Sequence, residues 1–392
     1  MKNNRTVLII RNTLIIFAVT TFYCFVKNFD MSESGLYSLF LCDFSIGICS
    51  RFLVGSILSL FKESFTIEWM LTFLRISTFT IFLGISHYFA STLTLADKKH
   101  KNTLTLLTGI FILFPFSVTI FAGDAFGFID IFCMLILLLT AYFCQNRFLI
   151  YLTPLLMIAG IFIHDSFLTA YMSPCLAIIA YYSIKNGGDK LTKAHPFFIS
   201  AVISVVTTVY SVFFSRKTLT MTAEEMLRYL AKKGNTTVEA VSGYIEDIVT
   251  WVDVRQVAPE GKDRNPLSNI FYMLKFGLDE FGINNFVGVI SVIPILALVI
   301  TVWIKAIKNN SIFSGKVPYI LFMLTLLPQI LSLMMSNDFT RFLSPLVITQ
   351  IFFLFVTARE KDKDTAVGLD FLGENPQMFL LPCMSVLLMN IL

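Results

Sequence analysis

A histidine and an aspartate stand side by side in an otherwise apolar stretch, GIFIHDSFLTAYMSP, at residues 160–174. Imidazole titrates closer to neutral pH than other side chains, so His164 could act as a general base that takes a proton from a substrate hydroxyl. Asp165 could orient the imidazole or take its place. The alternative is that a tight turn at the end of an apolar segment simply tolerates both groups. Ionisable groups at membrane depth are costly and commonly functional, which favours the catalytic role.

Three arginines are candidates for binding a phosphate group, because a planar guanidinium can donate hydrogen bonds to phosphate oxygens in pairs. Arg51 and Arg341 lie next to apolar runs, and Arg75 lies inside one. Arg51 could instead snorkel to lipid headgroups, and Arg75 could snorkel or pair two helices. The remaining candidates are carboxylates, with Asp43 and Asp124 as further bases and Asp30, Glu33 and Asp338 as secondary site residues.

The composition places these residues in a membrane protein. Of the 392 residues, 56% are hydrophobic and 14% are charged, and the mean hydropathy is +0.76. A hydrocarbon core about 30 Å thick takes about 20 apolar residues per helical span, and helices satisfy their own backbone groups in lipid. We therefore expect an all-α, polytopic integral membrane protein with ten or eleven transmembrane helices. The predicted spans are 12–28, 69–93, 103–122, 127–144, 148–165, 167–184, 197–214, 286–304, 317–335, 342–358 and, as an eleventh, 377–392.

The distribution of basic residues predicts the orientation. Every second short loop is rich in Lys and Arg, and such loops remain in the cytoplasm. The N-terminus should lie on the same side. The basic positions are Lys2, Arg5 and Arg11; Lys98, Lys99 and Lys101; Arg147; Lys185, Lys190 and Lys193; Lys305, Lys308 and Lys316; and Arg359, Lys361 and Lys363.

The loops between the basic ones carry the candidate site residues. The first of these loops, 28–66, includes an apolar segment at 36–61 that would break the alternation of basic loops if it crossed the membrane. We expect this segment to form interfacial helices in the outer leaflet. The chain then divides into an N-terminal transmembrane bundle (1–214), a long periplasmic helical loop (215–284) and a C-terminal transmembrane bundle (285–392).

The long loop has clear helical signals. TAEEMLRYLAKKGN begins with Thr222 as N-cap, has acidic residues in its first turn and basic ones in its last, and ends at Gly234. TTVEAVSGYIEDIVTWVDV predicts a second amphipathic helix. These helices could form a lid over the external mouth of the protein, or a solvated connector with no chemical role.

Several other kinds of site are not indicated. The seven cysteines are scattered without a CxxC pair, so we expect them to be packing residues and we expect no bound metal or cofactor. The sequence has no nucleotide-binding glycine loop and no nucleic-acid signature. REKDKD at 359–364 predicts a solvated cytoplasmic turn.

Four motifs, in this order and spacing, resemble a pattern among bacterial envelope-polysaccharide proteins. The motifs are CSRFLVGSIL, GDAFGFIDIF, GIFIHDSFLTAYMSP and NDFTRFLSPLV. The chain resembles the O-antigen polymerases and related exopolysaccharide polymerases, within the polyprenyl-sugar glycosyltransferases that have many spans. The resemblance covers most of the chain through short motifs. The long loop departs from the pattern because it has no clear Arg-x-x-x-Arg motif, and these polymerases often have two large external loops where this chain has one.

The resemblance implies a metal-independent enzyme of the bacterial inner membrane. It would transfer a growing glycan from undecaprenyl diphosphate to the sugar hydroxyl of another lipid-linked repeat unit, at the periplasmic face, in the biosynthesis of lipopolysaccharide or a similar surface polysaccharide. Its implied partners are these lipid-linked glycans, membrane lipid, a chain-length regulator and a flippase.

Two alternatives belong to other classes. A glycosyltransferase that uses a polyprenyl monophosphate sugar to modify O-antigen would take its acid and base from Asp30, Glu33 or Asp43. A lipid-linked oligosaccharide flippase, or another transporter, would be expected to show internal repeats and ionisable residues at mid-depth. The sequence has no convincing repeat, and its ionisable residues gather on one side.

Overall fold

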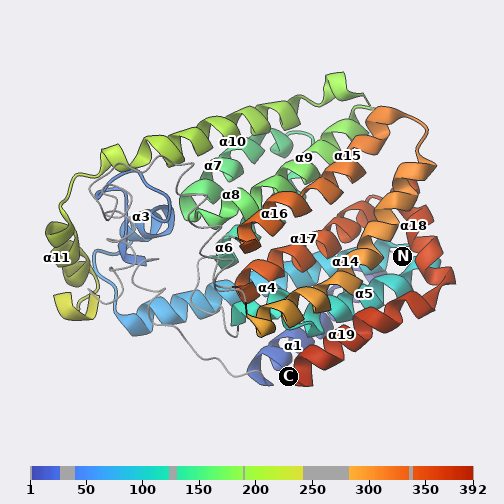
Figure 1. Cartoon of the computed structure of the whole chain (residues 1–392), viewed down its shortest axis with the longest axis horizontal. Coiled ribbons are helices and arrows are strands. Elements are labelled where there is room, and N and C mark those ends of the chain that lie inside the picture. Colours follow the sequence, from blue (N-terminus) through green and yellow to red (C-terminus); the bar gives the residue numbers. More distant parts are fainter. Residues whose placement is uncertain are drawn as a thin grey trace.

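The regular secondary structure of the protein is helical in the part that its computed structural model describes, residues 2–26, 40–122, 130–188, 190–241, 282–334 and 339–391 (Figure 1). Each of the eleven predicted spans coincides with helix in that part, so the all-α prediction is confirmed. The helices are α1 (Lys2–Val26), α3 (Leu53–Ser59), α4 (Ile67–Leu95), α5 (Lys101–Leu113), α6 (Asp130–Cys144), α7 (Thr153–Ile163), α8 (Ser166–Ala170), α9 (Met172–Asn186), α10 (His195–Phe213), α11 (Ala223–Lys233), α14 (Ile283–Asn309), α15 (Phe313–Leu324), α16 (Leu326–Met334), α17 (Phe339–Arg359), α18 (Lys363–Glu374) and α19 (Leu380–Ile391). Short 3-10 helices are η1 (Lys98–His100), η2 (Val118–Ala122), η3 (Leu149–Leu152), η4 (Leu191–Lys193), η5 (Ser215–Thr218) and η6 (Pro376–Phe379).

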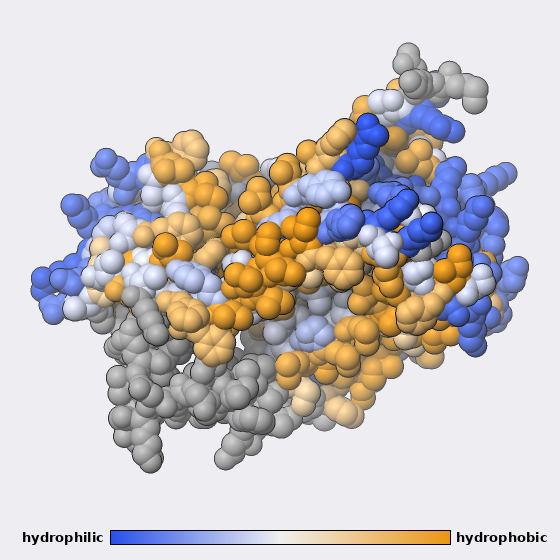
Figure 2. Space-filling view, turned by 90° about the horizontal axis from the view of Figure 1, so that it is seen from above, coloured by the Kyte–Doolittle hydropathy of each residue, from blue (hydrophilic) through white to orange (hydrophobic). Residues whose placement is uncertain are grey.

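Seven helical segments of the described chain are long and apolar enough to cross a membrane. Three shorter apolar segments, 130–144, 149–163 and 376–391, accompany them. Figure 2 shows apolar side chains across the middle of one face and hydrophilic side chains at both ends of that face. This arrangement is the one expected of a protein whose central zone lies in lipid. The seven spanning segments are Asn4–Val26, Ile67–Leu95, Lys98–Phe121, His195–Phe213, Asn285–Asn309, Phe313–Met334 and Arg341–Arg359.

α17 lies at the centre of the bundle. Of the apolar stretch of α17, 89% is buried inside the protein, whereas only 17% of the apolar stretch of α1 is buried. Phe353 stacks on Phe322 with ring centroids 4.3 Å apart. The Gln350 side chain accepts a hydrogen bond from Trp303 Nε1 at 3.1 Å and donates one to the Phe322 carbonyl at 2.8 Å. Because a buried amide is costly unless it is hydrogen-bonded, these contacts fix the position of α17 and of the residues at its N-terminal end.

The basic loops gather at one end of the molecule. α1 pairs with α4 in opposite directions, which places Asn12 beside Thr94. Lys99 pairs with Asp370, and Lys361 pairs with Asp97. We call this the basic end. Figure 1 shows α18 there, while α3 and α11 lie at the other end of the long axis, which we call the lid end.

A topology experiment follows from this arrangement. Reporter fusions after Lys99, Lys190 and Lys308 should all report the cytoplasm, because these residues belong to loops of the basic end. Fusions after Phe61 and Gly234, which belong to the lid end, should report the opposite side. A periplasmic signal at Lys99 would mean that the segment before α4 crosses the membrane.

The described part of the loop between α1 and α4 contains no helix of spanning length. Residues 42–52 form turns and irregular structure, and α3 has only seven residues. Gly55 packs so closely on the preceding turn that an added Cβ would lie 2.0 Å from the Cys42 carbonyl oxygen. Phe40, Leu41 and Cys42 are fully buried, so this loop packs onto the protein at the lid end.

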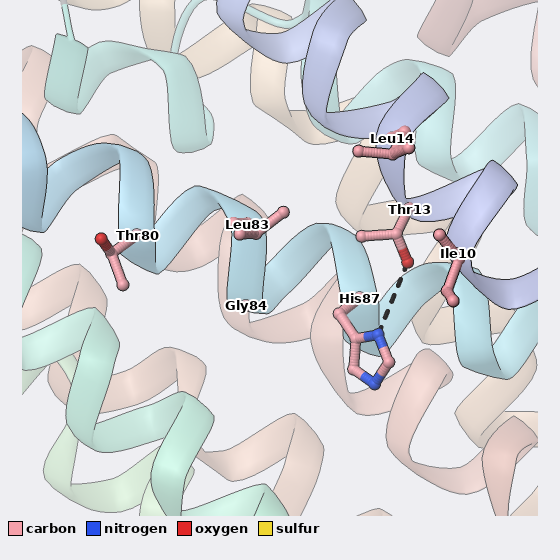
Figure 3. Close-up of a pocket in the computed structure, with 7 residues that line it drawn as sticks. All are labelled: Ile10, Thr13, Leu14, Thr80, Leu83, Gly84 and His87. Carbon is pink, nitrogen blue, oxygen red and sulfur yellow. Dashed lines mark hydrogen bonds between the residues drawn. The ribbon is translucent and has the colours of Figure 1, made fainter.

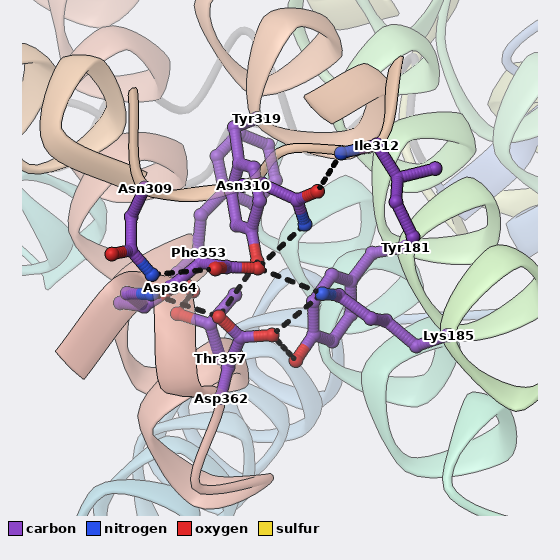
Figure 4. Close-up of polar contacts among 11 residues, drawn as sticks. Tyr181, Lys185, Asn309, Asn310, Ile312, Tyr319, Phe353, Thr357, Asp362 and Asp364 are labelled. Carbon is purple, nitrogen blue, oxygen red and sulfur yellow. Dashed lines mark hydrogen bonds and ion pairs between the residues drawn. The ribbon is translucent and has the colours of Figure 1, made fainter. Parts of the chain in front are cut away.

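The predicted turn at 359–364 is present, with Glu360, Lys361 and Lys363 exposed, but the prediction that it is solvated is wrong for its two aspartates. Asp362 and Asp364 are buried, and Lys185 Nζ lies 3.3 Å from the first carboxylate and 3.2 Å from the second (Figure 4). Tyr319 donates a 2.6 Å hydrogen bond to Asp362, and Asn310 donates a 2.7 Å bond to Asp364. These residues join α9, α15 and the ends of α14 and α17 at the basic end. Asp362 also caps α18 by accepting from Thr365 N at 2.8 Å, so the chain continues as a helix that the sequence interpretation missed.

Candidate functional site

Five ionisable residues from four separate parts of the chain converge near the lid end: Arg51, Asp130, His164, Asp165 and Arg341. We call them the charge cluster. Arg51 Nε lies 3.6 Å from Asp165 Oδ2, and Arg341 Nε lies 3.3 Å from Asp130 Oδ2. His164 lies within the electrostatic influence of the other four residues. The fold therefore brings together four predicted site residues, Arg51, His164, Asp165 and Arg341.

The two ion pairs differ in their exposure. The Arg51 and Asp165 side chains are 27% and 29% exposed, whereas those of Arg341 and Asp130 are 14% and 5% exposed. The Arg51–Asp165 pair is therefore the more accessible of the two, while the Arg341–Asp130 pair lies in a more enclosed environment. A residue in an exposed ion pair can exchange its partner at little cost. Breaking an enclosed ion pair is costly, because it leaves a desolvated charge.

Arg51 is held in an unusual backbone conformation. Its φ is 74°, in the left-handed region, which costs a residue with a side chain roughly 1–2 kcal/mol. The surrounding loop is tied down on both sides of the strained residue. Ser50 Oγ donates to the Ile161 carbonyl at 2.8 Å, and Ile48 N donates to Thr218 Oγ1 at 2.8 Å. These bonds link the loop to the end of α7 and to the segment before α11, and they direct Arg51 toward the α7–α8 turn.

Asp130 is a member of the site that was not among the predicted site residues. It is the first residue of α6 and is 4% exposed. Ser166 Oγ donates a 2.5 Å hydrogen bond to its Oδ1 atom, while its Oδ2 atom faces Arg341. The available sequence signal was a carboxylate at the start of an apolar run. That signal identifies a buried charge that needs a partner, but it does not identify Arg341 as the partner.

His164 lies in the turn between α7 and α8, outside the seven spanning segments. Its Nδ1 atom accepts a 2.9 Å hydrogen bond from the backbone N–H of Ser166. Because a backbone N–H can only donate, the neutral ring must carry its proton on Nε2. Burial, reinforced by the nearby Arg51 charge, lowers the pKa of His164 to about 3. Both observations indicate a neutral imidazole whose Nε2 is a hydrogen-bond donor.

Asp43 anchors α11, the lid helix, to the loop between α1 and α4. Its carboxylate forms an ion pair with Lys233 of α11 and accepts a 2.7 Å hydrogen bond from Tyr229. Ser45 N and Ser59 Oγ donate further bonds, at 2.9 and 3.1 Å. Burial acts to raise the pKa of Asp43, but the Lys233 ammonium and the Ser45 and Tyr229 hydroxyls outweigh it and lower that pKa to about 2. Its carboxylate oxygens are thus engaged by residues of the loop and the lid.

The expected boundaries of α11 are confirmed. Thr222 and Glu225 form a reciprocal capping box, with Glu225 N donating to Thr222 Oγ1 at 3.3 Å, and Gly234 follows the last turn. The backbone N–H of Phe65 donates to the Lys233 carbonyl at 2.7 Å. The second predicted lid helix extends beyond Val241 and lies mostly outside the described residues.

Removing the lid anchor should have a measurable effect. In Lys233→Met, the methionine fills the space of the buried lysine side chain but leaves Asp43 without its cation. We therefore expect α11 to become sensitive to limited proteolysis. The lowered pKa of Asp43 means that its ionised form stabilises the folded state above the ordinary carboxyl pKa of about 3.9. This contribution should be lost as the pH falls through about 2, so the wild-type digestion pattern should not change between pH 8 and pH 5. Equal protection of α11 in Lys233→Met and wild type would contradict an anchoring role. Lys232→Met, which changes the exposed neighbour, is the control.

The other predicted site residues are not part of the charge cluster as described. Arg75 is exposed on α4 and has no ion-pair partner within the described chain. Asp30, Glu33, Asp124 and Asp338 lie outside the described residues. The predicted packing role agrees with the burial of Cys24, Cys42, Cys133, Cys144 and Cys175.

An apolar groove lies between α1 and α4, toward the basic end. It is lined by Ile10, Thr13, Leu14, Thr80, Leu83, Gly84 and His87 (Figure 3). Thr13 and His87 face one another across it, with 3.5 Å between Thr13 Oγ1 and His87 Nδ1. The groove is separate from the charge cluster and contributes none of its residues.

The donor set of the charge cluster suits an anion better than a metal. No group of three or more His, Cys, Asp or Glu side chains that could hold a metal ion occurs among the residues described. Two guanidinium groups and an imidazole N–H can instead donate hydrogen bonds to phosphate oxygens. In the comparisons with known proteins, no family model, no curated protein and no solved structure matches this chain.

Proposed function

We propose that this chain is a membrane glycosyltransferase that polymerises polyprenyl-diphosphate-linked oligosaccharide repeat units. The observation that carries the proposal is the more accessible Arg51–Asp165 pair, which places a phosphate-binding cation beside a carboxylate base at the end of the molecule away from the basic loops. In this proposal the chain crosses the bacterial inner membrane ten or eleven times, with its N-terminus in the cytoplasm and the lid end in the periplasm.

The proposed step begins when the diphosphate of the donor lipid exchanges with Asp165 as the partner of Arg51. The acceptor sugar hydroxyl attacks the anomeric carbon of the donor glycan and loses its proton to the Asp165 carboxylate. The bond between the anomeric carbon and the diphosphate oxygen breaks, and polyprenyl diphosphate leaves with the electron pair. Arg51 and the Nε2–H group of His164 stabilise the charge that develops on the leaving group. Atoms and charge balance without a metal or a redox cofactor.

The contacts within the site favour residue roles that differ from those expected from the sequence. The contacts of His164 favour a donor over a base, since Nδ1 already accepts a hydrogen bond. Asp165 is the more exposed of the cluster carboxylates and lies beside Arg51, so we assign it the base role. Arg341 supports the site through Asp130. The engagement of Asp43 by Lys233 weighs against the side-branch transferase, in which Asp43 would be an acid or a base.

A purified-protein assay tests the proposed function. The protein is reconstituted in lipid nanodiscs and supplied with polyprenyl-diphosphate-linked repeat units, and the products are separated by length. Ladders of glycan on lipid, with release of polyprenyl diphosphate, are expected. A single added sugar from a polyprenyl monophosphate donor would support the alternative transferase. Unchanged glycan, combined with lipid-linked sugar crossing a vesicle bilayer, would support a flippase and contradict the polymerase.

A further inference from the structure

A chain of polar contacts connects Arg341 to His164. Arg341 Nε faces Asp130 Oδ2 at 3.3 Å, and Ser166 Oγ donates to Asp130 Oδ1 at 2.5 Å. The backbone N–H of the same serine then donates to His164 Nδ1 at 2.9 Å. Asp130, His164 and Ser166 are each no more than 6% exposed. The chain joins the first residue of α6, the N-terminal turn of α17 and the α7–α8 turn.

We infer that Asp130 and Ser166 are positioning residues that hold His164 as the neutral tautomer with its proton on Nε2. Asp130 fixes the Ser166 side chain, and Ser166 presents its backbone N–H to the imidazole. The tautomer follows from these contacts alone. The use of the Nε2–H group as a donor to a diphosphate oxygen rests on the proposed function.

The charges around the imidazole support a neutral ring. His164 faces Arg51 from the first external loop, Asp130 from α6, Arg341 from α17 and Asp165 from its own turn. Two cations and two anions offset one another, and burial then disfavours an added charge. A neutral donor suits a leaving diphosphate, because it stabilises developing charge without giving up its own proton before the bond breaks.

A simpler role for His164 is to hold the turn before α8 by accepting the backbone N–H two residues further on. An asparagine side chain can accept the Ser166 N–H in the same way, but it has no group equivalent to the imidazole Nε2–H in position or reach. His164→Asn therefore retains the turn contact and removes the donor. It is the reference variant for separating the two roles.

Nitrogen NMR measures the tautomer directly, without an activity assay. The chain has four histidines, so protein labelled with ¹⁵N-histidine in nanodiscs gives four imidazole pairs, and His164→Asn assigns one of them. We expect His164 to show an unprotonated Nδ1 and a protonated Nε2 that stay unchanged from pH 8 to pH 5. A proton on Nδ1, or titration near the ordinary histidine pKa of about 6.5, would overturn the inference.

Substitutions at Ser166 test the positioning chain. Ser166→Ala breaks the link to Asp130, so His164 should show a mixture of tautomers, while Ser166→Thr retains the hydroxyl and should keep the wild-type spectrum. Thr169→Ala removes a neighbouring hydroxyl of α8 that bonds Ser332 and should also leave the spectrum unchanged. A wild-type spectrum for Ser166→Ala would show that the serine does not position the ring.

The activity of the same variants gives a separate result. Under the proposed function, Ser166→Ala should lower kcat about tenfold with little change in KM, and Ser166→Thr should restore it, as expected for a group acting in the transition state. If the spectra change as expected but the protein extends no glycan, the positioning inference stands and the polymerase proposal is rejected. Normal kcat in His164→Asn would reject the donor role of the imidazole.

Discussion

Replacing Asp165 with Asn should slow glycan extension on the order of a hundredfold or more, because a positioned general base contributes about 10²–10⁴ to the rate. Asn matches Asp in size and can accept a hydrogen bond, but it cannot take a proton from the acceptor hydroxyl. The substitution also removes a partner of Arg51 that lies 3.6 Å away and is partly exposed, so its cost in stability should be small. The measurement is kcat in nanodiscs with polyprenyl-diphosphate-linked repeat units.

Asp370→Asn provides the matched control. Asp370 is a partly exposed carboxylate at the basic end, where it pairs with Lys99 and His100. The same change there should leave kcat unaltered. If Asp165→Asn retained full activity, the base would have to be another group.

The pH profile adds a second measure of this assignment. The pKa of His164 is lowered to about 3 by burial and by Arg51, so the ring stays neutral as the pH falls from 8 to 5. Loss of activity on the acid side should therefore follow a carboxylate and should persist in His164→Asn with the same midpoint. An acid limb near pH 6.5 that disappears in His164→Asn would return the base role to the histidine.

The second large effect concerns the enclosed pair. Arg341→Gln should destabilise the protein by roughly 3–5 kcal/mol, because it leaves the Asp130 carboxylate buried without its cation. The measurement is the temperature at which detergent-solubilised protein loses its monodisperse elution. Glycan extension should fall as well, since Asp130 then no longer fixes Ser166.

The double variant Asp130→Asn with Arg341→Gln isolates the cause. Removing both charges should restore most of the thermal stability, because no unpaired charge remains, while activity should stay low. Arg341→Lys keeps the charge but loses the planar guanidinium, so it should retain more stability than Arg341→Gln. Additive losses in the double variant would mean that the two residues do not act as a pair.

The sequence was sufficient for features that depend on local patterns. Each predicted span contains helix because a long apolar run suits lipid, where a helix satisfies its own backbone groups. α11 begins at its capping box because Thr222 and Glu225 satisfy the first backbone N–H groups. The grouping of the basic loops at one end also followed from their alternation along the chain.

Long-range pairing was not accessible in the same way. Asp362 and Asp364 stand in a run of charged residues that is typical of a solvated turn, yet Lys185 and Tyr319 of other helices enclose them. Asp43 was chosen as a base because a carboxylate in an apolar segment is unusual, but Lys233 supplies its partner from the lid. The sequence thus indicated an unusual carboxylate at Asp43 but not the burial of Asp362 and Asp364. In both cases the identity of the partner depended on which parts of the chain pack together.

The anchor between Asp43 and Lys233 also has a consequence for biosynthesis. The two residues are 190 positions apart, so a ribosome that adds about 5–20 residues per second makes the lysine roughly 10–40 s after the aspartate. During that interval the loop between α1 and α4 lacks Lys233, the bond that Ile48 N donates to Thr218 and the bond that Thr220 N donates to Ile46, because Thr218 and Thr220 lie only slightly earlier in the chain than Lys233. The Ser50–Ile161 bond can form before α10 and the lid helix emerge, because both residues precede them in the chain. The Thr218 bond and the Lys233 anchor, which complete the support of the loop that carries Arg51, can form only later.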